Sequence, residues 1–179
     1  MNLLASFAPF FAFAILIHLG YVATALWVGA AVAAALLLRE RFVLHRSLKI
    51  LEVGTLVLFA GLAFYTQITG QSWTIPAVRL VVDAGLLLIV LASLAIGQPF
   101  TLQYAREGTP PEIWSTPQFI EVNRTITLVW AAAFAVLVLA DAAMVYVPEI
   151  PQRIDILATV LALVGAYKFT VRATSQASQ

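Results

Sequence analysis

The feature that most constrains this chain is a long stretch, residues 3–38, that contains no charged side chain. As one straight helix it would be about 54 Å long, whereas the hydrocarbon core of a bilayer is about 30 Å thick. The stretch must therefore break, and we predict a turn from His18 to Gly20, because glycine gives the backbone extra freedom. This predicts a tight hairpin of two segments, 3–19 and 20–38. The alternative is an N-terminal helix that lies at the membrane interface.

The remainder of the chain is equally apolar. Hydrophobic residues make up 62% and charged residues only 11%, whereas about a quarter of the residues are charged in a soluble domain. Such a chain cannot cover a water-facing surface. We therefore expect an all-α polytopic membrane helical bundle, a single integral membrane domain over residues 1–179 with five to six transmembrane segments. Segments of the required length are predicted at about 3–19, 20–38, 50–69, 76–96, 125–147 and 154–171.

Composition also argues against several functions. The net charge of +1 gives no basic footprint for nucleic acid. The chain has no cysteine and only two histidines, His18 and His45, so no metal site is expected. No Ser/His/Asp set, histidine pair or phosphate-binding loop is visible. The sequence therefore predicts a protein that is not an enzyme and has no cofactor.

The distribution of Lys and Arg predicts the orientation. The loop 39–49 carries four basic residues against the single acid Glu40: Arg39, Arg41, Arg46 and Lys49. Loops rich in basic residues stay in the cytoplasm, and alternation from there also places the loop 97–124 and the C-terminus inside. Of the ten basic residues, only Arg79 and Arg153 then lie outside.

The loop 97–124 is the longest segment expected to face water. Gly97 and Pro99 predict the end of the preceding helix. Pro117 predicts the start of the next one, which we expect to run along the interface and to enter the membrane after Arg124. The loop is either a plain connector or a docking surface for partners, and its candidate docking residues are Tyr104, Arg106 and Trp114.

Charged residues within the apolar segments are further candidates, because they are costly in a membrane and often functional. Asp83 lies four residues after Arg79, so both share one helical face. Asp141 has no basic residue one helical turn away. With His18 these residues form a candidate outward polar cluster. The alternatives are a local Arg79–Asp83 pair and a structural bond from Asp141 to another helix.

Small residues recur every fourth position at Ala25, Gly29 and Ala33. This spacing allows two helices to approach closely. It predicts packing inside the bundle, and an interface with a partner or a second copy of the chain is the alternative.

Several pieces of the sequence, in order, resemble the intracellular septation protein A family of small bacterial inner-membrane proteins. The pieces are LLASFAPFFAF, YVATALWVGAAV, LKILEVGTLVLFAGLAF, IGQPF, PPEIW and NRTITLVWAAAF. The chain departs from the family pattern at Gln98, where lysine is usual, and near Asp141, where asparagine is frequent. The loop between Trp114 and Asn123 is also longer, so the resemblance is to a divergent member.

The resemblance implies a multi-pass protein of the bacterial inner membrane with a cytoplasmic C-terminus. It implies a role in cell-envelope maintenance, septation and cell division, exerted through membrane-protein partners and without a chemical reaction. Membrane lipids are further expected partners, and a homo-oligomer is left open. The alternative function is a small transporter or lipid-handling protein that uses the polar cluster around Asp83 and Asp141.

Overall fold

The long uncharged stretch folds as two helices joined at a glycine. In a computed structural model of the chain, which describes residues 3–147 and 149–177, α1 (Ala8–His18) follows a 3₁₀ turn at Leu3–Phe7. The next helix, α2, spans Val22–Leu38. Gly20 between them has φ +86°, a conformation that favours glycine. The break therefore lies at the turn that the sequence predicts.

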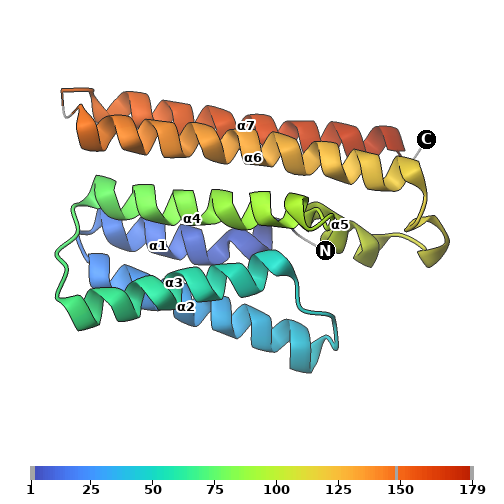
Figure 1. Cartoon of the computed structure of the whole chain (residues 1–179), viewed down its shortest axis with the longest axis horizontal. Coiled ribbons are helices and arrows are strands. Elements are labelled where there is room, and N and C mark those ends of the chain that lie inside the picture. Colours follow the sequence, from blue (N-terminus) through green and yellow to red (C-terminus); the bar gives the residue numbers. More distant parts are fainter. Residues whose placement is uncertain (1–2, 148, 178–179) are drawn as a thin grey trace. The chain divides into compact units, whose positions relative to one another are not determined.

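All regular elements in the described ranges are helical, which confirms the all-α fold class (Figure 1). After α2 come a π-helical turn at Arg39–Val43, α3 (Ile50–Thr69), α4 (Ile75–Ala95) and α5 (Phe100–Ala105). Two 3₁₀ turns, Arg106–Gly108 and Pro111–Ile113, lead to α6 (Pro117–Tyr146) and α7 (Gln152–Ala177).

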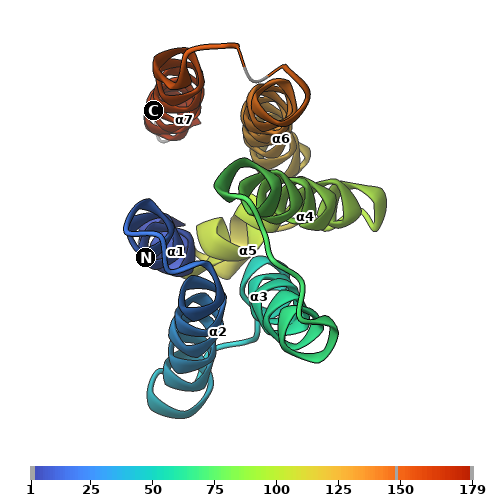
Figure 2. The ribbon, with the colours of Figure 1, turned by 90° about the vertical axis from the view of Figure 1, so that its left-hand side faces the viewer.

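Five helical stretches in the described part of the chain are long and apolar enough to cross a membrane: Val22–Val43, Ile50–Thr69, Ile75–Ala95, Pro117–Tyr146 and Gln152–Ser175. The chain is thus an integral membrane protein. The remaining apolar stretch, Ala5–His18, is about 21 Å long by helical rise, shorter than the bilayer core of about 30 Å. It lies beside α2 (Figures 1 and 2) and buries Phe13 and Ile17. It is therefore a short helix paired with α2.

The chain divides within α4 into two compact units, one up to Ile89 and one from Val90 onward. In the first unit the core surrounds Phe59 of α3, whose side chain is fully buried. The Phe59 ring lies 5.2 Å from the ring of Phe10 and 5.4 Å from that of Phe13. Phe59 thereby joins α3 to α1.

The small residues Ala25, Gly29 and Ala33 are all buried on α2. A Cβ atom added at Gly29 would lie 2.7 Å from Cδ1 of Phe59, closer than side-chain atoms pack. The absence of a side chain at Gly29 therefore allows α2 to approach α3, and this stripe packs inside the unit.

In the second unit, α6 and α7 form an antiparallel pair. The N-terminus of α6 is capped by Thr116 Oγ1, which accepts a hydrogen bond from the Phe119 amide at 3.4 Å. From Pro117 onward, α6 is one continuous helix, about 45 Å long by helical rise. The interfacial stretch predicted before Arg124 is thus part of the same helix. Trp130 Nε1 donates to Thr170 Oγ1 of α7 at 3.0 Å.

The packing at Gly29 predicts a position-specific effect of a single methyl group. Gly29→Ala should destabilise the protein by about 1–3 kcal/mol, because a new methyl group would overpack the Phe59 ring. Gly61→Ala is the matched control, because nothing lies within 4 Å of its added Cβ and alanine favours a helix. Thermal unfolding in detergent measures the stability of both variants. Equal melting temperatures for Gly29→Ala and Gly61→Ala would contradict the packing account.

Candidate functional site: a buried ionic network

The segment between α2 and α3 turns its one acidic side chain inward. The π-helical turn is closed by a hydrogen bond from the Leu44 amide to the Arg39 carbonyl, 3.0 Å long. Within this turn Glu40 is only 6% exposed, whereas Arg39 and Arg41 on either side are exposed. The Arg46 amide donates to the Glu40 carbonyl at 2.9 Å and so folds the segment back over that residue.

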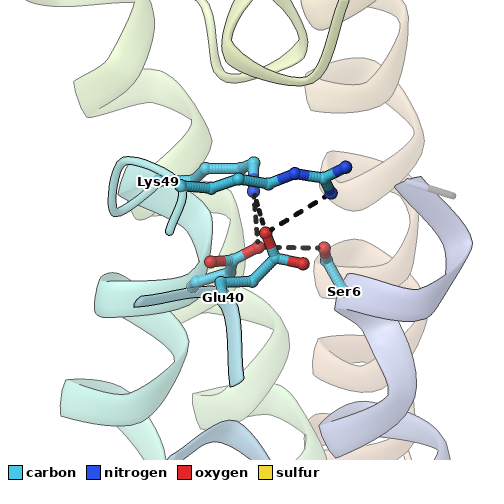
Figure 3. Close-up of polar contacts among 5 residues, drawn as sticks. Ser6, Glu40 and Lys49 are labelled. Atoms are coloured by element: carbon cyan, nitrogen blue, oxygen red, sulfur yellow. Dashed lines mark hydrogen bonds and ion pairs between the residues drawn. The ribbon is translucent and has the colours of Figure 1, made fainter. Parts of the chain in front are cut away.

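Lys49 is the centre of the site, and its side chain is almost completely buried, at 1% exposed. Its Nζ donates hydrogen bonds to Glu40 Oε2 at 3.1 Å and to Glu52 Oε1 at 3.4 Å (Figure 3). Lys49 directly precedes α3 and Glu52 lies in the first turn of that helix. One ammonium group therefore bridges the end of α2 and the start of α3.

Two further side chains complete the network. Arg46 Nη1 lies 3.7 Å from Glu40 Oε2, and its side chain remains 38% exposed. Ser6 Oγ donates to Glu52 Oε1 at 3.5 Å. Because Ser6 belongs to the first 3₁₀ turn, the network also ties the N-terminal segment to α3 (Figure 3).

The charges of this network balance. Two carboxylates, of Glu40 and Glu52, face the ammonium of Lys49 and the guanidinium of Arg46. A buried charge is tolerated only when it is paired and hydrogen-bonded, and each of these charges has a partner. The arrangement can fix the connector between α2 and α3. Within the ranges that the structure describes, no group of His, Cys, Asp and Glu side chains could hold a metal ion.

This site is not predicted from the sequence. The loop 39–49 is interpreted there as a basic connector, with Glu40 and Lys49 counted among its charges, whereas the structure buries both residues. The available signal was the spacing of Lys49 and Glu52, which places opposite charges on one face of a helix start. The spacing does not reveal that Glu40 joins them from the preceding helix.

The predicted outward polar cluster is spread over three helices. His18 is exposed at the end of α1. Arg79 and Asp83 are half-buried and lie one turn apart on α4. Asp141 is 0% exposed on α6, in the second unit. The cluster remains a prediction.

The predicted docking loop is a folded segment rather than an open connector. Tyr104, expected to face water, is only 7% exposed and packs edge-on against the Phe100 ring. It is therefore poorly placed to dock a partner. Arg106 and Trp114 are half-buried, and the guanidinium carbon of Arg106 lies 5.7 Å from the centre of the Trp114 ring, within the range of a cation–π contact. Trp114 Nε1 donates to the Thr109 carbonyl at 3.0 Å.

Neutral hydrogen bonds attach this segment to α6 and to the end of α4. Thr101 Oγ1 donates to the Asn123 carbonyl at 2.7 Å and lies 2.8 Å from Thr127 Oγ1. Ser93 Oγ accepts from the Phe100 amide at 3.1 Å. All of these side chains are buried, as expected where small polar residues connect apolar helices.

Comparison of the chain with protein-family models, with curated proteins and with solved structures finds no match.

The ionic network predicts a strong dependence of stability on Lys49. Lys49→Met should lower the free energy of unfolding by about 3–5 kcal/mol, because it leaves two carboxylates buried beside each other without their common ammonium partner. Lys168→Met, which removes an exposed lysine of α7, should change it little.

A double variant separates charge from packing. Adding Glu52→Gln to Lys49→Met should recover part of the loss, because Glu40 keeps Arg46 as a partner. Denaturant or thermal unfolding in detergent measures the stability of the Lys49→Met, Lys168→Met and double variants against that of the unaltered protein. The ionic account would be wrong if the double variant were less stable than Lys49→Met alone.

Proposed function

We propose that this chain acts through membrane-protein partners, and not through a reaction of its own, in maintenance and septation of the cell envelope in the bacterial inner membrane. The proposal rests on the ordered resemblance to the septation protein A family along the sequence. It is supported by the five apolar helices, which require a membrane, and by the folded segment between α4 and α6.

The observation that carries the proposal is the Arg106–Trp114 pair. Tryptophan and arginine are the residues most enriched at the energetic centres of protein interfaces. Here the guanidinium and the indole contact each other, and the indole N–H is fixed by Thr109. Buried Phe100 and Thr101 hold the base of the segment. A rigid aromatic–cationic pair that is still partly accessible is suited to bind a partner with little loss of conformational entropy.

The experiment follows a fluorescent fusion at the C-terminus in dividing cells. The unaltered protein should be enriched at the septum, and Arg106→Gln with Trp114→Ala should abolish the enrichment at an unchanged protein level. The control is Arg172→Gln with Trp27→Ala, which removes the same residue types from α7 and α2. An even envelope distribution of the unaltered protein, or equal enrichment of both double variants, would contradict the proposal.

A second candidate function, transport of protons or small cations, is supported by the complete burial of Asp141 in α6. Ionisable residues inside membrane helices are costly and mark ion pathways in many transporters. On this candidate, Asp141→Asn should abolish proton flux in proteoliposomes loaded with a pH-sensitive dye, at an unchanged melting temperature. Asp83→Asn, at a half-buried position, is the comparison. A lower melting temperature with unchanged flux would assign Asp141 a structural role.

A further inference from the structure

The segment that closes the ionic network presents an unusual outer surface. We call residues 39–48 the basic turn. Cationic and apolar side chains are both exposed on it, beside the polar residues His45 and Ser47. Arg39 and Arg41 are exposed, and the exposed apolar side chains are Phe42 at 68%, Val43 at 69% and Leu48 at 45%.

The network is the reason that this surface carries one sign of charge. The only acidic residue of the basic turn is Glu40, and its carboxylate points inward to Lys49 at 3.1 Å. Burial of Glu40 removes the negative charge that would otherwise lie between Arg39 and Arg41. Because the Glu40 carboxylate faces inward, the exposed guanidinium groups of Arg39 and Arg41 can bind an anion from outside the chain.

The position of the basic turn relative to the membrane identifies that anion. The apolar stretch Val22–Val43 is about 33 Å long by helical rise, close to the thickness of the bilayer core. Phe42 and Val43 therefore lie where the core ends, at the level at which aromatic side chains enter the interface. Arginine side chains at this depth extend toward the phosphate groups.

We propose that the basic turn is a binding surface for the headgroups of anionic phospholipids. Arg39 and Arg41 bind the phosphodiester, since guanidinium groups recognise phosphate through paired hydrogen bonds, while Phe42 and Val43 insert between the acyl chains next to it. Charge complementarity selects anionic over zwitterionic lipids. This inference does not depend on the partner-binding function, because it involves other residues than the Arg106–Trp114 pair.

The test uses the purified full chain in a neutral detergent, titrated with short-chain phosphatidylglycerol or phosphatidylcholine and followed by native mass spectrometry. Phosphatidylglycerol should bind more tightly than phosphatidylcholine to the unaltered protein. Each arginine near a membrane surface contributes about fivefold to the affinity for anionic lipid. The double variant Arg39→Gln with Arg41→Gln should therefore bind phosphatidylglycerol about 25-fold more weakly than the unaltered protein. Added salt should reduce this ratio of affinities, because it screens the arginine charges.

The control is Lys168→Gln with Arg172→Gln, which removes two exposed positive charges from α7 and should change the affinity less than twofold. Both double variants should keep the melting temperature of the unaltered protein, because all four side chains are exposed. Equal binding of the two lipids, or equal loss in the two double variants, would overturn the proposal. A third outcome would also contradict the proposal. In it, the Arg39 and Arg41 variant no longer cross-links to a protein that the unaltered protein captures, while its affinity for phosphatidylglycerol is unchanged.

Discussion

The first unit depends on one ammonium group held between two carboxylates. Lys49 lies at the point where the chain leaves a connector and enters α3, and its hydrogen bonds to Glu40 and Glu52 fix that point against the end of α2. Ser6 extends the same network to the N-terminal turn. In an apolar environment such a group cannot leave its partners without a large cost in desolvation. The network therefore defines the path of the connector, and with it the direction in which Arg39 and Arg41 point.

The second unit contains hydrogen bonds between neutral groups, from Thr101 to Asn123 and from Trp130 to Thr170. Such bonds contribute less individually than ion pairs, but they need no charge compensation. The bond from Thr101 holds the segment that carries Arg106 and Trp114 against α6. In each unit internal polar bonds thus hold the side chains on which a proposal depends, Arg39 and Arg41 in the first unit and the Arg106–Trp114 pair in the second.

The sequence predicts the elements of this fold well, because spans depend on length and hydropathy. The turn at Gly20 and the start of α6 at Pro117 lie where local backbone rules place them. Burial of single polar residues is harder to predict, because it depends on contacts between distant segments. From the sequence, Glu40 is interpreted as a charge of an exposed loop. In the structure the π-helical turn directs its side chain to Lys49. Tyr104 is predicted to face water because it lies in a loop of the sequence, but it belongs to α5, which packs against α6, and its side chain is buried.

Lys49 is enclosed by carboxylates, and the chain allows a direct test because its only other lysine is Lys168. The measurement is modification of the folded protein in detergent with an amine-reactive ester, followed by peptide mass spectrometry. Lys168, which is exposed, should be modified rapidly, and Lys49, at 1% exposed, should react only after denaturation. Modification of both lysines at the same rate in the folded protein would contradict the account.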